Sequence, residues 1–184
     1  CGGSGIIRLK ESRGCQYASL SAPMPDASGA APALAVLVRH AHAQWPLYSG
    51  RDFDRPLTPR GEEDARASAQ AIRAAGPVPT LILSSPARRT RQTAYILAQV
   101  LGLPGERLLF VDALYNGRTD TLESELRRVS RRGTATVLVA HNPGISDLAR
   151  RMSGDPQRPD FSPGGWACLA LADCVVVDVQ CDYL

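Results

Sequence analysis

The chain has 184 residues, of which 44% are apolar, and a formal net charge of +3. This length suffices for one well-buried core and is short for two, so we expect one domain. The small charge, without a block of like charges, argues against sequence-independent binding of a nucleic acid backbone. No apolar run approaches the roughly 18 to 20 residues of a membrane span, so we expect a soluble protein.

Residues 1–32 are rich in Gly, Ser, Ala and Pro and lack sustained periodicity, which predicts a flexible leader before a domain that spans residues 33–184. Met24 is a plausible true start, and residues 1–23 would then be an upstream extension. The alternative takes Cys1 as the lipid-bearing start of a lipoprotein. The five cysteines form no C-x-x-C pair and no metal-like cluster, which favours a reduced, cytoplasmic protein.

Beyond the leader, short apolar runs alternate with segments of helical spacing. This alternation is the signature of an α/β fold with a largely parallel sheet. The last two runs look like a closing antiparallel pair. The runs predicted as strands are Leu34–Val38, Leu81–Leu83, Leu108–Val111, Val137–Ala140, Ala167–Leu171 and Val175–Val179.

Helical segments follow four sets of start signals. The first helix has Thr58 as its N-cap and Pro59 at its first position, and it stops at Gly76. The other three are expected from Ser85-Pro86 to Gly102, over about Asp120 to Arg132, and from Asn142-Pro143 to Gly154. The arginines late in the third segment suit the negative end of the helix dipole, so they are interpreted as helix-terminus and surface charges.

Three of the predicted strands end in a polar junction. These junctions are Arg39-His40, Ser84-Ser85-Pro86 and His141-Asn142-Pro143. The carboxyl ends of parallel strands form the ligand crevice of an open sheet, so we expect the junction residues to converge. Either histidine alone is more often structural, but two at such junctions with arginines nearby indicate a site.

The arginines at these junctions favour a phosphate ligand. Arg39 follows a buried strand, where a cation needs an anion; the alternative partner is a core carboxylate. Its guanidinium offers paired donors that suit phosphate oxygens. Arg88 and Arg89 lie in the first turn of the second helix, where a cation is unfavourable unless an anion compensates, and we select Arg89 as the ligand-binding residue.

The ordered set of motifs resembles the histidine phosphatase superfamily, also called the phosphoglycerate-mutase-like family. Within it, the chain is most similar to the small bacterial phosphohistidine phosphatases of the SixA type. The resemblance implies a three-layer α/β/α sandwich with a mostly parallel sheet, and a site that needs no metal or cofactor. The matching stretches are Leu37–Ala41, Asp54–Gly61, Ser84–Thr93 and Val139–Gly144.

The resemblance also implies a role for each site residue. His40 matches the histidine that becomes phosphorylated, and Arg39 matches its phosphate-binding neighbour. Arg89 and His141 match the second pocket arginine and the second histidine, and Arg55 matches an arginine that reaches the site in the small subfamily. Attack by a neutral imidazole would divide the reaction into transfer to His40 and hydrolysis of the phosphohistidine.

Two positions depart from the commonest motif. Ala41 stands where many members have glycine, although alanine is frequent in the small branch. His42 stands where an acid is usual, and we expect it to face away from the phosphate. The proton donor is open: Asp112 is a candidate general acid, and a turn or N-cap role for it is an equal alternative.

The resulting hypothesis is a monomeric, metal-independent phosphatase that acts on phosphohistidine in a partner protein such as a phosphotransfer domain. Because the proton donor for the leaving group is open, phosphohistidine is the favoured substrate: its imidazole is a better leaving group than an alkoxide, which needs protonation by a positioned acid. One alternative is a phosphatase for small phosphomonoesters. The other, from a different class, is a catalytically silent module that binds a phosphorylated ligand.

Overall fold

The computed structural model describes residues 31–44, 50–171 and 179–181. Its centre is a six-stranded sheet of order β3-β2-β4-β1-β5-β6. The β1, β2, β3 and β4 strands run parallel to one another, while β5 is antiparallel to β1 and β6 is antiparallel to β5. The strands are β1 (Leu34–Arg39), β2 (Pro79–Ser84), β3 (Leu108–Phe110), β4 (Ala135–Ala140), β5 (Trp166–Ala170) and β6 (Val179–Cys181).

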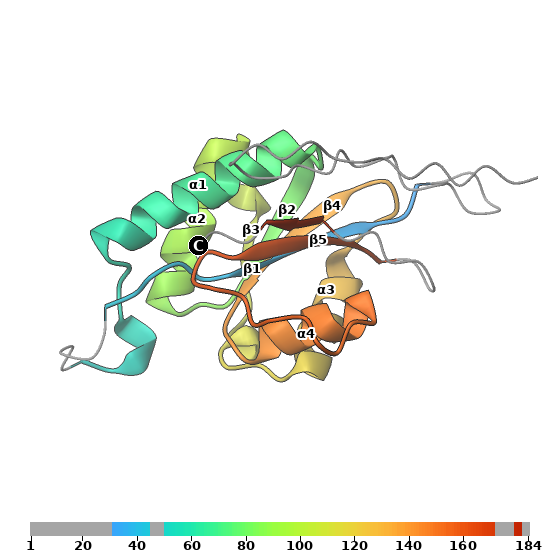
Figure 1. Cartoon of the computed structure of the whole chain (residues 1–184). Helices are drawn as coiled ribbons and strands as arrows, with labels where there is room; N and C mark the ends of the chain where they lie inside the picture. Colours follow the sequence, from blue (N-terminus) through green and yellow to red (C-terminus); the bar gives the residue numbers. More distant parts are fainter. Residues whose placement is uncertain (1–30, 45–49, 172–178, 182–184) are drawn as a thin grey trace, which may run out of the picture.

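Helices cover both faces of this sheet, which confirms the predicted three-layer sandwich (Figure 1). The α1 and α2 helices lie on one face and α3 and α4 on the other. The helices are α1 (Pro59–Ala75), α2 (Arg88–Leu101), α3 (Thr119–Val129) and α4 (Gly144–Ser153). Short 3-10 turns are η1 (Asp52–Asp54), η2 (Gly105–Arg107) and η3 (Asp112–Leu114).

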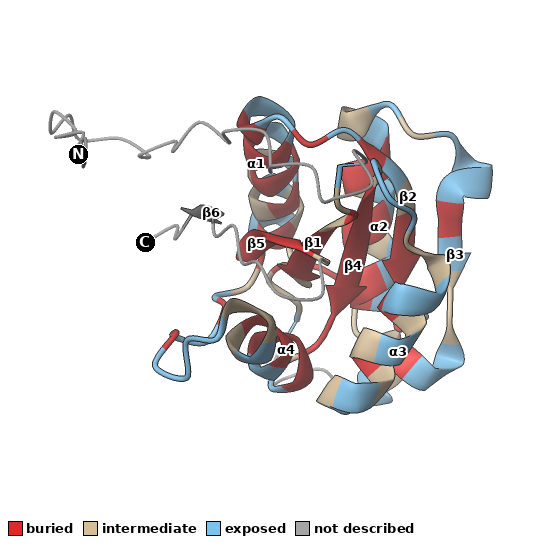
Figure 2. Cartoon of the chain, turned by 90° about the vertical axis from the view of Figure 1, so that its right-hand side faces the viewer, coloured by how far each residue is buried: buried red, intermediate tan, exposed pale blue. Residues whose placement is uncertain are grey.

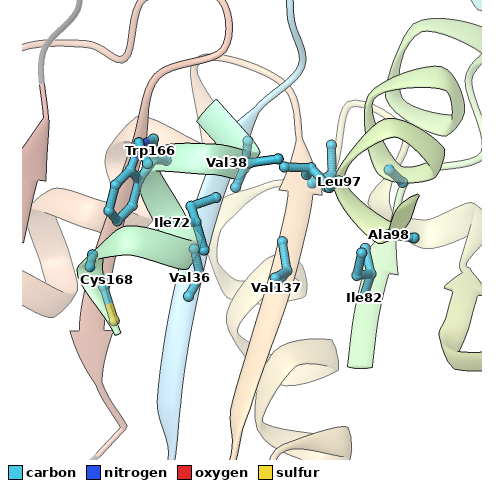
Figure 3. Packing of buried hydrophobic residues seen from close by; sticks show 14 of the residues in the cluster. Val36, Val38, Ile72, Ile82, Leu97, Ala98, Val137, Trp166 and Cys168 are labelled. Carbon is cyan, nitrogen blue, oxygen red and sulfur yellow. The ribbon is translucent and has the colours of Figure 1, made fainter. Parts of the chain in front are cut away.

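The alternation of side chains along β1 explains how one strand supports two cores. Val36 and Val38 point toward α1 and α2, where Ile72 and Leu97 meet them (Figure 3). The intervening residues of β1 pack against leucine and isoleucine side chains of α3 and α4. Because both faces are covered, the central strands are buried almost throughout (Figure 2) and read as continuous apolar runs.

The helix boundaries follow the signals in the sequence. The hydroxyl of Thr58 accepts a hydrogen bond from the Gly61 N–H at the start of α1, as expected of an N-cap. Three helices end at a glycine of positive φ, as predicted: Gly76 (φ 103°), Gly102 (φ 74°) and Gly154 (φ 68°).

One predicted boundary is corrected. The third helix ends at Val129, three residues before the predicted Arg132, because Ser130 takes up an extended conformation and turns its hydroxyl back to the Leu126 carbonyl. Arg131 therefore lies after the helix and donates to the carbonyls of Arg128 and Ser130.

Of the predicted last strand, Val175–Val179, only Val179 is among the described residues, and it begins β6 (Val179–Cys181). Residues 172–178 lie outside the described residues, and so does the predicted leader up to residue 30. The antiparallel pairing of the last two strands is confirmed. Within the described ranges, no helix combines the length and apolar character of a membrane span.

Candidate active site

The three polar junctions of the sequence lie together at one edge of the sheet. Pairing of β1 with β4 sets Arg39 opposite Ala140, and pairing of β2 with β4 sets Ser84 opposite Val139. The residues that follow these strand ends are consequently neighbours. The ring centroids of His40 and His141 are 5.2 Å apart, which confirms the predicted convergence.

Backbone contacts of the His40 ring fix which nitrogen can attack. Its Nδ1 lies 2.8 Å from the carbonyl oxygen of Ala41, and a carbonyl can only accept, so Nδ1 carries the hydrogen. Nε2 therefore holds the lone pair and accepts a hydrogen bond of 3.2 Å from Arg89 Nε. Burial, assisted by the charges of Arg89, Arg39 and Arg55, lowers the pKa of His40 from 6.5 to about 4 despite its bond to Ala41, which keeps the ring neutral and nucleophilic.

The Arg89 guanidinium connects the other groups. It is only 4% exposed and lies beside His40, whereas its neighbour Arg88 is exposed. Besides its bond to His40, Arg89 Nη2 lies 3.2 Å from His141 Nδ1. The remaining bonds go to Asp52, from Nη1 to the backbone oxygen (2.6 Å) and from Nη2 to Oδ2 (2.9 Å).

Contacts on both sides hold the His141 ring. Because Arg89 is always a donor, Nδ1 of His141 is the acceptor, and the Nε2 hydrogen points to Ser85 Oγ at 2.8 Å. The edge-on ring of Tyr115 packs against it with centroids 5.6 Å apart. Burial and then the neighbouring His40 and Arg89 lower the pKa of His141 to about 3, against the opposing effect of Asp52.

Arg39 and Arg55 border the same site. Arg39 Nη1 donates to the Phe161 carbonyl at 2.6 Å, and its buried Nε has no partner among the described residues. Burial lowers the pKa of Arg39, and the charge of Asp160 opposes this effect. Arg55 donates from Nε to the Gln44 carbonyl at 2.8 Å, and its charge reaches both histidines.

Asp52 is the site residue that sequence reasoning missed. Its Oδ1 accepts from Arg55 Nη1 at 2.7 Å, and its Oδ2 accepts from Arg89 and from the Tyr115 hydroxyl, each at 2.9 Å. Desolvation raises the pKa of Asp52, but the Tyr115 bond and the two arginines outweigh it, so the net pKa is lowered. The only local signal was an acid three residues before Arg55, and nothing distinguished it from other loop acids.

Asp112 stands apart from these contacts. It is exposed at the start of the η3 turn, and its backbone oxygen accepts the Tyr115 N–H at 3.0 Å. Across the described residues, its carboxylate makes no hydrogen bond or ion pair to the groups around His40. Its role as proton donor remains a prediction. His42 turns to α1, where its Nδ1 lies 2.8 Å from Asp64 Oδ2.

An open pocket of about 400 Å³ adjoins His141. Its walls come from the segment that leads into α3, from the first turn of α3, from the residues before α4 and from α4 itself, and they include Asn116, Arg118, Asn142 and Arg151. A leaving group attached to a phosphoryl group beside His141 could lie there. Within the described part of the chain, no cluster of three or more His, Cys, Asp or Glu side chains is arranged to hold a metal ion.

Comparison with known sequences gives a consistent family. The family model described as "histidine phosphatase superfamily (branch 1)" matches residues 35–114. An uncharacterized chloroplastic protein of Arabidopsis thaliana is 38% identical over 127 residues, which are 65% of this chain and 58% of that protein. GpmB of Cronobacter sakazakii, named as a probable phosphoglycerate mutase, is 34% identical over 64% of this chain and 59% of its own. The chain thus spans less than two thirds of either relative.

Solved structures similar to this chain include two that are named as proposed SixA phosphohistidine phosphatases. The structure from Agrobacterium tumefaciens has a TM-score of 0.68 and 28% identity, and the match covers 79% of this chain and 96% of that one. The structure from Nakamurella has a TM-score of 0.63 and 30% identity, with 76% of this chain and 86% of that one covered.

Proposed function

The chain belongs to the histidine phosphatase superfamily, and on that premise we propose that it is a metal-independent phosphatase that works through a phosphorylated His40. The proposal rests on one observation: His40 Nε2 accepts a hydrogen bond from the Arg89 guanidinium, so its lone pair faces a site that is bordered by arginines. A phosphoryl group placed between His40 and His141 would receive the Arg89 hydrogen bonds that the two imidazoles now accept.

The reaction divides into two displacements. In the first, the Nε2 lone pair forms a bond to phosphorus, and the leaving group departs with the electrons of its former bond and then takes up a proton. In the second, water attacks phosphorus, the nitrogen–phosphorus bond returns its electrons to Nε2, and the proton of water is released. The Ala41 carbonyl holds the Nδ1 hydrogen in both steps, and Arg39 and Arg89 donate to the equatorial oxygens. His141 donates as well once its Nδ1 carries a hydrogen, with the Ser85 hydroxyl then donating to its Nε2.

For the substrate, we propose phosphohistidine in a partner protein such as a phosphotransfer domain. The likeness to the SixA structures supports this class, and so does an open pocket that a protein side chain could enter. The exposed position of Asp112 supports it as well, because an imidazole leaving group depends less on a positioned acid. We also propose that the protein acts as a cytoplasmic monomer, which light scattering and cell fractionation can test.

The decisive experiment compares wild type with His40→Ala on a phosphohistidine protein. Wild type should release inorganic phosphate and carry a transient phosphoryl group at His40, and the variant should do neither. His42→Ala is the matched control, since it removes a histidine two residues away that contacts α1. Activity retained by His40→Ala would refute the mechanism.

The same site could serve a small phosphomonoester, and the likeness to GpmB together with the pocket beside His141 favours this second candidate. A panel of phosphomonoesters set against phosphohistidine separates the two. If Asp112 is the acid, Asp112→Asn should slow only ester hydrolysis. Failure of every phosphodonor to label His40 would favour the third reading, a silent module that binds a phosphorylated ligand.

A further inference from the structure

A half-exposed carboxylate borders a site that is otherwise suited to an anion. Asp52 sits on η1, far in sequence from Arg89, yet its backbone oxygen and its Oδ2 each accept a hydrogen bond from that guanidinium. Its other carboxylate oxygen binds Arg55, and the Tyr115 hydroxyl anchors Oδ2 from a third segment of the chain.

The Arg89 donors fall into two groups. Nη1 and one hydrogen of Nη2 point to Asp52. Nε and the other hydrogen of Nη2 point to His40 Nε2 and His141 Nδ1, between which the phosphoryl group would bind. A guanidinium is rigid and planar, so fixing one edge fixes the direction of the other. Asp52 thus holds the far edge of Arg89 and leaves the near edge for the ligand.

The negative charge of Asp52 also affects how tightly the site binds phosphate. Arg39, Arg55 and Arg89 supply three positive charges, both histidines are neutral, and Asp52 supplies one negative charge. The net charge of these six groups is +2, equal and opposite to that of a phosphoryl dianion. Asp160, whose charge also reaches Arg39, is paired with Arg150. Without the carboxylate, the site would hold an excess positive charge and would retain inorganic phosphate, the product, more tightly.

We propose that Asp52 is a positioning residue of this phosphatase, which aims Arg89 and Arg55 at the phosphoryl group and limits the affinity of the site for released phosphate. The inference rests on the proposed function. It assigns to Asp52 a part in turnover that no motif of the sequence indicated.

The Asp52→Asn variant separates this role from a merely structural one. An amide has one acceptor oxygen, so one of the two arginines would face an N–H group and lose its partner. We expect kcat to fall about tenfold to a hundredfold, the range expected when a catalytic group is misplaced. The dissociation constant for inorganic phosphate should fall about threefold or more, because the variant gains one positive charge at the site.

The experiment measures kcat on a phosphohistidine protein and, by calorimetric titration, the binding of inorganic phosphate. Asp54→Asn is the matched control: it makes the same charge change two residues away, where the carboxylate binds Arg51, and both values should stay within twofold of wild type. Tyr115→Phe removes one anchor of Asp52 but keeps the charge, so kcat should fall by less and phosphate affinity should stay unchanged.

An unchanged kcat in Asp52→Asn would overturn the inference. So would phosphate binding that is unchanged or weaker, because a damaged site would lose turnover and affinity together. The titration requires no turnover, so it tests Asp52 even if the proposed substrate is wrong. Failure of the proposed function shows separately, as activity retained by His40→Ala.

Discussion

Arg89→Lys tests the central electrostatic element of the site. Lysine keeps the positive charge but replaces a planar fork with a single ammonium, which cannot contact His40, His141 and Asp52 together. The two donors directed at the phosphoryl position are lost or misplaced. Hydrogen bonds that involve a charged group contribute about 1.5–3 kcal/mol each, so the barrier should rise by about 3–6 kcal/mol. This corresponds to a loss of about 10²- to 10⁴-fold in rate.

The assay follows phosphorylation of His40 in a single turnover by phosphoramidate, a small donor with a phosphorus–nitrogen bond. Arg88→Lys is the matched control, because Arg88 lies next in the same helix and is exposed. It should keep the wild-type rate. A phosphorylation rate for Arg89→Lys within tenfold of wild type would refute the reasoning, because it would show that charge alone, without the geometry of the guanidinium, suffices.

The remaining predictions concern protonation, support of the second histidine and backbone packing. Burial lowers the pKa of His40 to about 4 and that of His141 to about 3, so NMR should find both rings neutral at pH 5.5. A titration midpoint near 6.5 for either ring would contradict this. Between about pH 6.5 and 4 only the unfolded chain takes up these protons, so the free energy of unfolding in urea should fall as the pH is lowered through this range. Ser85→Ala removes the partner of the His141 Nε2 hydrogen. It should lower the free energy of unfolding by about 1–3 kcal/mol and slow the phosphorylation of His40. Wild-type values for both quantities would show that Ser85 does not hold the His141 ring in place. Gly61→Ala would place a Cβ 2.0 Å from the His42 carbonyl oxygen, so thermal unfolding should show a clear loss of stability, and an unchanged melting temperature would mean that the loop after His40 yields easily.

Local features of the sequence were enough for the α/β class and for most helix ends, while the three layers were implied by the family resemblance. The continuous apolar run of Leu34–Val38 indicated a strand buried on both faces, and the Thr58 and Gly76 signals set the ends of α1. These features act within a few residues of one another, so they can be read without tertiary structure. The end of α3 was missed because the arginines at 131 and 132 suggested a longer helix. The backbone of Ser130 is extended, and its hydroxyl donates to the Leu126 carbonyl, so the helix ends at Val129.

For the active site, the amino-acid order shows which side chains follow the strand ends, and parallel pairing of the strands brings those ends to one edge of the sheet. That argument placed His40, Arg89 and His141 together before any coordinates. It could not find Asp52, whose role depends on a contact with Arg89 across 37 residues of sequence. Nor could it choose the attacking nitrogen, because the direction of the ring is set by the Ala41 carbonyl in the folded loop. Residue types and order favoured a phosphate ligand. How the guanidiniums and rings are aimed follows from tertiary packing, because a hydrogen bond between distant segments has a direction only once those segments are packed.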